Sequence, residues 1–334
     1  MGKKDILRNI SCLHSSILFS NLLDINPSLR CTSEVHACVV KSRFSSEIFI
    51  LNKLIESYGK RSSLESARKL FDQMPHRNTY SWNAILHVHL KLTLVAESVQ
   101  LFSQIPNPDR CSWNLMISGL VQADSFEEAL IYFVKMHRLG FAPDDYTFGS
   151  ATNACSKTRN LKAGTQIHAC VAKSLLSVSS GSALVDMYSK CGFVGSSQQV
   201  FDEMTERNRV TWNSLISCYE QNGPPHKALQ VFYMMKNELP PDEMTLASVI
   251  SACATLSAIP QGREIHSYFL KRRRFTGDVV ILNALVDMYS KCGKIEVARA
   301  VFESIPSCNL ISETSMVRAY AKEDLEAARV HADG

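Results

Sequence analysis

An internal repeat constrains this chain more than any other feature of its sequence. Ten residues, ALVDMYSKCG, occur identically at 183–192 and at 284–293. All three tryptophans also share one phase, because Trp82, Trp113 and Trp212 each stand in a Ser-Trp-Asn or Thr-Trp-Asn triplet. Self-similarity of this kind indicates one supersecondary unit built many times over, so the fold has to be inferred from the repeat.

The length of the repeat varies in a regular way. One position per repeat gives the series Asn52, Asn83, Asn114, Gly149, Ser182, Asn213, Ala247, Asn283 and Thr314. The successive steps are 31, 31, 35, 33, 31, 34, 36 and 31 residues. A period of about a hundred residues is therefore superimposed on the single repeat, since Asn114 to Asn213 is 99 residues and Asn213 to Thr314 is 101.

Each repeat is predicted to form two helices. In the first helix, Trp212, Leu215, Ile216 and Tyr219 have the spacing of a single apolar stripe. In the second helix, a small residue precedes a phenylalanine by four positions. These pairs are Ala67/Phe71, Ser98/Phe102, Ala129/Phe133, Ser197/Phe201, Ala228/Phe232 and Ala298/Phe302. A pair four residues apart lies on one helix face, where the small residue permits close approach of a neighbouring helix.

The ends of these helices are also marked in the sequence. The first helix ends in Lys-Cys-Gly at 190–192 and 291–293, where glycine suits the left-handed position after a helix. Pro75, Pro106 and Pro306 end the second helix. A two-helix repeat cannot bury its stripe alone, and no strand-like alternation persists. We therefore predict an all-α fold, a right-handed α-solenoid of stacked two-helix repeats.

These repeats resemble the pentatricopeptide repeats (PPR) of the plant PLS type, which alternates a 35-residue unit, a longer variable unit and a short unit of 31. The resemblance covers residues 13–334 and leaves 1–12 as an N-terminal segment, the remnant of a targeting peptide or a plain helix. Units are assigned at about 13–47, 48–78, 79–109, 110–144, 145–177, 178–208, 209–242, 243–278, 279–309 and a partial 310–334. The tetratricopeptide repeat, with its constant period, fits less well.

The resemblance implies a binding protein for single-stranded RNA that reads one base per unit with the fifth and the last residue. The resemblance implies Asn52 with Asn78 for a pyrimidine, preferably C, and Asn283 with Asn309 for C. It implies U for Asn83 with Asp109, Asn114 with Asp144 and Asn213 with Asp242, and A for Ser182 with Asn208. Gly149 and Ala247 have no polar side-chain group, so no base is assigned to their units. The implied target is C/U-U-U-N-A-U-N-C.

The second residue of each unit is implied to lie between adjacent bases, which gives packing that tolerates any sequence. The apolar residues at this position are Phe49, Tyr80, Val210 and Val280. Lys271-Arg272-Arg273-Arg274 either contacts phosphates or is a solvated helix end.

Each of these candidates has a structural alternative. An asparagine near a helix start, or an Asp or Asn closing a unit, is commonly a helix cap, and capping and base reading can coexist. The recurrence of asparagine at the same position of successive repeats favours base reading. The tryptophans lie on the apolar stripe and are expected in the core. His36, His168 and His266 recur in phase but lie repeats apart, so we predict no metal site and no cofactor.

No catalytic pattern is found. Plant relatives with a zinc deaminase domain need H-x-E and C-x-x-C motifs, and this chain has neither. It also lacks a phosphate-binding Gly loop and a G-x-S-x-G motif. We predict a protein that is not an enzyme and has no E or DYW extension, and that ends within a repeat at Gly334. An editing role would need a separate enzyme as partner.

Two classes of function remain open. The first is an RNA-binding specificity factor in organellar RNA processing, such as C-to-U editing, in the mitochondrion or alternatively the chloroplast. The second is a protein-binding scaffold or a truncated fragment without function. The net charge of +4 permits a polyanionic partner without requiring one. The absence of about 18 uninterrupted apolar residues predicts no membrane partner.

Overall fold

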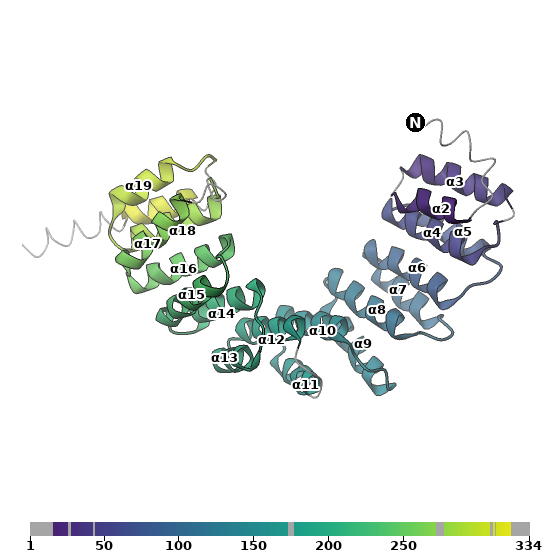
Figure 1. Cartoon of the computed structure of the whole chain (residues 1–334), viewed down its shortest axis with the longest axis horizontal. Helices are drawn as coiled ribbons and strands as arrows, with labels where there is room; N and C mark the ends of the chain where they lie inside the picture. The colour runs from purple at the N-terminus through teal and green to yellow at the C-terminus, as the bar shows by residue number, and fades with distance from the viewer. Residues whose placement is uncertain are drawn as a thin grey trace, which may run out of the picture. The chain divides into compact units, whose positions relative to one another are not determined.

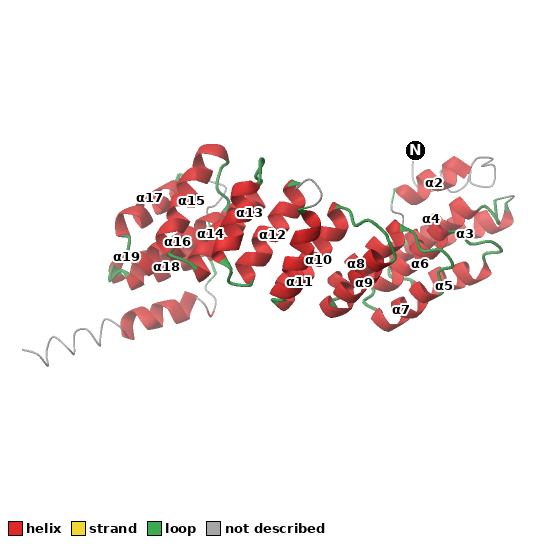
Figure 2. Cartoon of the chain, turned by 90° about the horizontal axis from the view of Figure 1, so that it is seen from below, coloured by secondary structure: helices red, strands yellow, loops and turns green. Residues whose placement is uncertain are grey.

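The computed structural model describes residues 16–25, 28–42, 44–172, 177–271, 277–307, 310 and 312–321. Within these ranges the chain consists of helices and connecting loops, and no strand is formed (Figure 2). None of the described helices is long and apolar enough to cross a membrane. The predicted N-terminal segment 1–12 and the last residues of the partial unit lie outside the described ranges.

Helices follow one another in pairs along the chain, as the repeat predicts. The first helices are α4 (Ile48–Lys60), α6 (Thr79–Lys91), α8 (Arg110–Gln122), α10 (Asp145–Thr158), α12 (Val178–Lys190), α14 (Arg209–Asn222), α16 (Glu243–Leu256) and α18 (Val279–Lys291). The second helices are α5 (Leu64–Gln73), α7 (Val95–Ser103), α9 (Phe126–Arg138), α11 (Leu161–Val171), α13 (Val194–Glu203), α15 (Pro225–Glu238), α17 (Ile259–Leu270) and α19 (Ile295–Glu303). Upstream lie α2 (Ser16–Asp24) and α3 (Leu29–Lys41).

The chain divides into two compact halves, Met1–Thr158 and Arg159–Gly334. In the first half, each of the first helices α4, α6, α8 and α10 packs against the next (Figure 1). In the second half, α12, α14, α16 and α18 do the same. Within most repeats the first helix also packs against its own second helix. Each half is therefore a stack of helical repeats with a core between the helices.

Tryptophan and phenylalanine form the contact between many successive repeats. Trp212 packs edge-to-face on Phe201 of the preceding second helix, with ring centroids 4.8 Å apart, and it is only 1% exposed. Trp113 makes the same contact with Phe102 at 4.8 Å. Such aromatic pairs add about 0.5–1.5 kcal/mol beyond the burial of their area. The predicted core role is confirmed for Trp113 and Trp212, whereas Trp82 is only partly buried.

The in-phase histidines have a structural partner in the next repeat. Nδ1 of His36 lies 2.9 Å from the Tyr58 hydroxyl, and the equivalent distance for His266 and Tyr289 is 3.0 Å. His168 and Tyr188 repeat the contact at 2.9 Å. Burial lowers the pKa of each of these histidines below its ordinary value of 6.5. The predicted structural role is thus supported, because each histidine joins a long repeat to the short repeat after it.

The turn between the two helices of a repeat needs a left-handed residue. Gly192 has φ +81° and Gly293 has φ +69°, as the Lys-Cys-Gly pattern predicts. In the repeat 79–109, Thr93 stands at the equivalent position with φ +58°. The hydrogen bonds match, because Leu94 N donates to His89 O and Phe193 N donates to Tyr188 O. A β-branched residue is strained in this region.

We predict that Thr93→Gly stabilises the protein and that Gly192→Thr destabilises it. The left-handed conformation costs an L-residue roughly 1–2 kcal/mol, of which Thr93→Gly recovers about 0.5 kcal/mol after the entropy of glycine in the unfolded chain is counted. Urea denaturation curves of the three proteins would measure the change. A lower midpoint for Thr93→Gly than for the unchanged protein would contradict this account of the turn.

Candidate nucleic-acid interface

The last residue of each repeat lies immediately before the next first helix. In most of the described repeats its side chain accepts a hydrogen bond from the third backbone amide of that helix, whereas Glu47 before α4 makes no such bond. Asp109 accepts from Ser112 N at 2.8 Å, Asp242 from Thr245 N at 2.9 Å and Asn208 from Thr211 N at 2.9 Å. The first amides of a helix lack partners in the helix itself, so these side chains are helix caps. These residues therefore have the helix-capping role that their sequence position allowed as an alternative to base reading.

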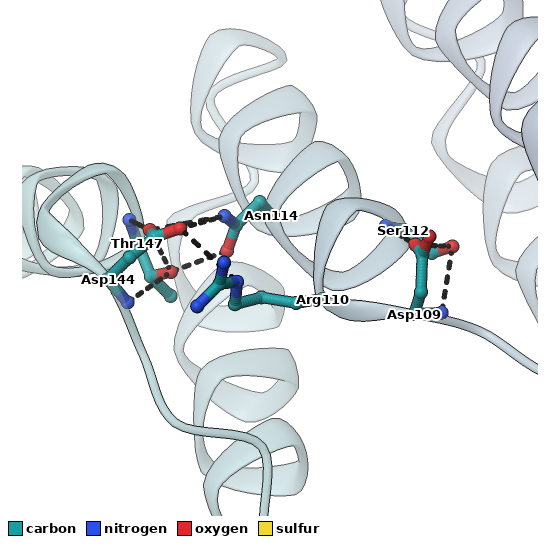
Figure 3. A network of polar contacts seen from close by, with 6 residues as sticks. All are labelled: Asp109, Arg110, Ser112, Asn114, Asp144 and Thr147. Carbon is teal, nitrogen blue, oxygen red and sulfur yellow. Dashed lines mark hydrogen bonds and ion pairs between the residues drawn. The ribbon is translucent and has the colours of Figure 1, made fainter.

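The fifth residue of a repeat reaches the cap that closes the same repeat. Asn114 Nδ2 lies 3.1 Å from Oδ1 and 2.9 Å from Oδ2 of Asp144, and Arg110 Nε lies 3.7 Å from the same Oδ2 (Figure 3). The two residues are thirty positions apart in sequence. Stacking of the repeats therefore brings together the two side chains that the sequence paired.

The same geometry recurs about a hundred residues later. Asn213 Nδ2 lies 3.0 and 3.1 Å from the two carboxylate oxygens of Asp242. Arg209 Nε stands 3.9 Å from Asp242 Oδ2. The pair Asn83 and Asp109 is looser, with Nδ2 at 3.5 Å from Oδ1.

The remaining predicted pairs differ from this pattern. Ser182 Oγ donates to Asn208 Oδ1 at 3.2 Å, so this pair is also in contact. No hydrogen bond joins the described side chains of Asn52 and Asn78, and Asn52 Oδ1 is buried without a partner. Asn283 accepts from Ser312 Oγ at 2.6 Å. Its predicted partner Asn309 lies outside the described residues, as do Arg272, Arg273 and Arg274.

The carboxylates in these pairs are held in their charged form. Burial raises the pKa of Asp144, but hydrogen bonds from the Thr147 amide and hydroxyl and from Asn114 outweigh it, and the pKa falls below its ordinary value of 3.8. Burial likewise raises the pKa of Asp242, but hydrogen bonds from Thr245 and Asn213 outweigh it and lower the pKa below its ordinary value. Both groups are therefore ionised at neutral pH and act only as acceptors.

Exposed apolar side chains precede the paired residues on the same helices. The predicted base-sandwiching residues Phe49, Tyr80, Val210 and Val280 are 52–59% exposed. Tyr146 and Met244, which sequence reasoning missed, occupy the same phase in the long repeats and are 57% and 63% exposed. Their place as the second residue of each unit is the sequence signal that identifies them. The apolar series therefore continues through the long repeats.

A series of lysines was also missed from the sequence. An exposed lysine ends or nearly ends many of the first helices, eleven residues after the second position of the repeat. These lysines are Lys60, Lys91, Lys157, Lys190 and Lys291. Eleven residues are close to three helical turns, so each lysine lies on the same face as the residue at the second position, which is apolar in every case except Ser179 before Lys190. Lys60 and Lys91 line a hollow of about 280 Å³ with Glu56, Gly59, His87 and Val88.

The described residues contain no group of three or more His, Cys, Asp or Glu side chains that could hold a metal ion. The interface thus consists of amides, carboxylates, hydroxyls, lysines and exposed apolar groups. Such groups can bind a polyanion with polar base edges, since they supply donors, acceptors and stacking surfaces.

Comparison with known families identifies the repeat. A model of the PPR repeat matches residues 49–79, 182–209 and 280–310, and a model of the PPR repeat family matches 108–157 and 207–255. Together these matches cover more than half of the chain. The chain belongs to the PPR repeat family.

Plant proteins of this family are similar along nearly the whole chain. Pentatricopeptide repeat-containing protein At2g13600 of Arabidopsis thaliana is 49% identical over 94% of this PPR chain and 46% of its own length. A putative mitochondrial PPR protein of the same plant, At3g13770, is 32% identical over 89% of this chain and 43% of its own length. The chloroplastic At1g15510 is 34% identical over 87% of this chain and 30% of its own length. The chain spans less than half the length of these relatives.

The fold is also that of a solved PPR protein. The crystal structure of PPR10 in complex with an 18-nucleotide psaJ RNA element matches with a TM-score of 0.61, at 18% identity over 98% of this chain and 57% of PPR10. The predicted all-α solenoid of two-helix repeats is confirmed by this match and by the helices described above.

We predict that Asp144→Asn with Asp242→Asn reduces the loss of stability in acid. The folded protein holds both carboxyls at a pKa below 3.8, so their ionised form stabilises the fold above that pH. This contribution disappears as the pH falls through the lowered pKa values, whereas an asparagine cap does not titrate. Thermal midpoints between about pH 6 and pH 2 would show a shallower acid decline for the double variant. The exposed Asp72→Asn, which caps no helix, is the control, and equal declines in all three proteins would refute the assignment.

Proposed function

We propose that this PPR protein, of the PLS type, binds single-stranded RNA in a sequence-specific way and reads one base per repeat. The observation that carries the proposal is the recurring contact between the fifth and last residues, seen at Asn114–Asp144 and Asn213–Asp242. A scaffold for protein binding has no need to repeat such a donor–acceptor pair at one phase. Each pair presents an amide donor beside a carboxylate acceptor, which complements the polar edge of a base.

The exposed apolar residues supply the sequence-tolerant part of this function. Phe49, Tyr80, Val210 and Val280 lie on the same helices as the paired residues and are open to solvent. A side chain of this kind can pack between two unstacked bases, and stacking on an aromatic ring contributes about 1–3 kcal/mol per base. Tyr146 and Met244 extend this role to the long repeats. Each of the two bases written N in the target therefore also packs against an apolar side chain, although its identity is not read.

The target that follows is C/U-U-U-N-A-U-N-C. Asn52 with Asn78 takes the first base, Asn83 with Asp109 the second and Asn114 with Asp144 the third. Ser182 with Asn208 takes the fifth, Asn213 with Asp242 the sixth and Asn283 with Asn309 the eighth. The protein acts as a specificity factor in organellar RNA processing, such as C-to-U editing, and recruits its enzyme as a separate partner. Relatives named mitochondrial and chloroplastic support an organelle as its location.

We expect the purified protein to bind CUUNAUNC RNA more tightly than CAANAUNC RNA. Asn83→Ala with Asn114→Ala should remove this preference, because each substitution removes the donor that faces the base. Each lost hydrogen bond between a side chain and a base corresponds to about a tenfold change in Kd. Fluorescence anisotropy at a fixed salt concentration would measure both RNAs.

The matched control for that experiment is Gln100→Ala with Asn237→Ala, which removes two exposed amides from second helices. The control should retain the preference for CUUNAUNC. Absence of binding to either RNA at low salt would reject the proposed function and leave a protein scaffold. Equal binding of both RNAs by the unchanged protein would reject base reading.

The lysine series is expected to contact phosphates. Lys60→Gln with Lys91→Gln should weaken binding to every RNA sequence alike, and should reduce the slope of log K against log salt by about 1.4, the value for two phosphates of a single strand. The control is Lys69→Gln with Lys162→Gln on second helices. A loss of sequence preference in the first variant, or an equal change of slope in the control, would count against this role.

A further inference from the structure

Three repeats carry the same Asn and Asp pair but surround it differently. In the repeat 110–144, Thr147 Oγ1 donates to Asn114 Oδ1 at 2.5 Å and lies 2.8 Å from Asp144 Oδ1 (Figure 3). In the repeat 209–242, Thr245 Oγ1 makes the same contact with Asn213 Oδ1 at 2.6 Å. In both, the amide oxygen is bonded to a hydroxyl and the amide nitrogen to a carboxylate, so the side chain is held at both ends.

The repeat 79–109 lacks this arrangement. Ser112 stands where Thr147 stands in the next repeat, and its hydroxyl donates to Asp109 Oδ1 at 2.8 Å. Asn83 Oδ1 is left buried without a partner, in a side chain that is only 8% exposed. A buried acceptor without a partner is unfavourable, so the Asn83 amide is held less firmly in this orientation than an amide that is bonded at both ends.

The residue type at this position correlates with the contact. Threonine reaches the fifth residue in each described case, at Thr147, Thr245 and Thr211, whose hydroxyl lies 2.6 Å from Ser182 Oγ. Serine does so at Ser312 but not at Ser112. The branched β-carbon of threonine restricts its side-chain rotamer, whereas serine can turn its hydroxyl to the cap alone.

The first residue of the repeat also distinguishes the repeats 110–144 and 209–242 from the repeat 79–109. Arg110 and Arg209 place a guanidinium 3.7 and 3.9 Å from the outer carboxylate oxygen of the pair. Thr79 occupies this position in the repeat 79–109. The arginine supplies a countercharge that keeps the carboxylate oriented toward the asparagine.

We propose that Thr147 and Thr245 are specificity-determining positioning residues, which fix the asparagine amide of the preceding repeat so that uracil is strongly preferred to cytosine. The proposal rests on the RNA-reading function proposed above. The repeat 79–109, which is followed by Ser112 in place of a threonine, discriminates less between the two pyrimidines although its fifth and last residues are the same.

The hydrogen-bonding edges of the bases explain this difference. Uracil presents the acceptor O4 beside the donor N3–H, whereas cytosine presents the donor N4–H₂ beside the acceptor N3. A held asparagine offers only its second Nδ2 hydrogen, and the neighbouring carboxylate offers an acceptor, which fits uracil. No hydroxyl holds the Oδ1 of Asn83, so this amide can turn and present its oxygen to the amino group of cytosine, and that repeat binds both bases.

The test measures the ratio of the Kd for C to the Kd for U at one RNA position at a time. CUUAAUAC is compared with the same RNA carrying C at the second, third or sixth position. The ratio at the third and sixth positions should exceed that at the second by about fivefold, the equivalent of one hydrogen bond. Thr147→Val should lower the third-position ratio alone by about fivefold. Thr147→Ser retains the hydroxyl and should preserve part of the ratio.

Ser112→Thr is the complementary variant and should raise the ratio at the second position. A purely structural role for Thr147 would weaken binding of U and C equally and leave every ratio unchanged, which would overturn the proposal. So would equal ratios at the second and third positions in the unchanged protein. Failure of the unchanged protein to bind CUUAAUAC at low salt would instead reject the proposed function itself, so the two failures are distinguishable.

Discussion

The helix cap at the end of each repeat is the constraint on which the interface depends. The first amides of every first helix need an acceptor, and Asp, Asn, Ser and Thr are the residues that supply one at this position. These side chains are also the ones that can bond a base edge. A carboxylate serves both purposes at once, because Oδ1 of Asp144 accepts from the helix while its Oδ2 accepts from Asn114. At four of the described junctions the fold therefore places the capping side chain in contact with the fifth residue of the same repeat, as in Asn114–Asp144 and Asn213–Asp242.

The packing between repeats explains the period of about a hundred residues. Phe201–Trp212 represents one kind of junction and His266–Tyr289 another, and the histidine kind follows the long repeats. The junction before the long repeat 145–177 has neither pair and brings Phe133 near Phe148 instead. A hydrogen-bonded His–Tyr pair is directional, whereas an edge-to-face aromatic pair is mainly apolar. These kinds of junction thus set different local contacts within an otherwise uniform stack. The interface inherits this alternation, since the long repeats carry Gly149 and Ala247 where the others carry a polar reader.

Local features of the fold could be predicted from the sequence because they depend on neighbouring residues. The apolar stripe around Trp212 and the left-handed Gly192 follow from spacing along the chain, whereas the pairing of Asn114 with Asp144 is implied by the family resemblance. The contact from Thr147 to Asn114 could not be predicted, because it joins residues 33 positions apart and depends on ångström-level stacking of two helices. Tyr146 and Met244 could have been predicted from phase alone. The assignments of Asn309 and of residues 272–274 stay predictions.

Electrostatics separates affinity from specificity in this interface. The carboxylates of Asp109, Asp144 and Asp242 remain charged at neutral pH and would by themselves repel a phosphate backbone. Arg110 and Arg209 offset two of these charges locally, and the exposed lysines lie on the same face as the stacking residues. In the proposed function, phosphate contacts hold any strand, whereas the amide–carboxylate pairs distinguish bases. On that proposal, two residues per repeat describe base recognition incompletely, because the neighbouring hydroxyl and guanidinium determine which hydrogen bonds of the pair are left for the base.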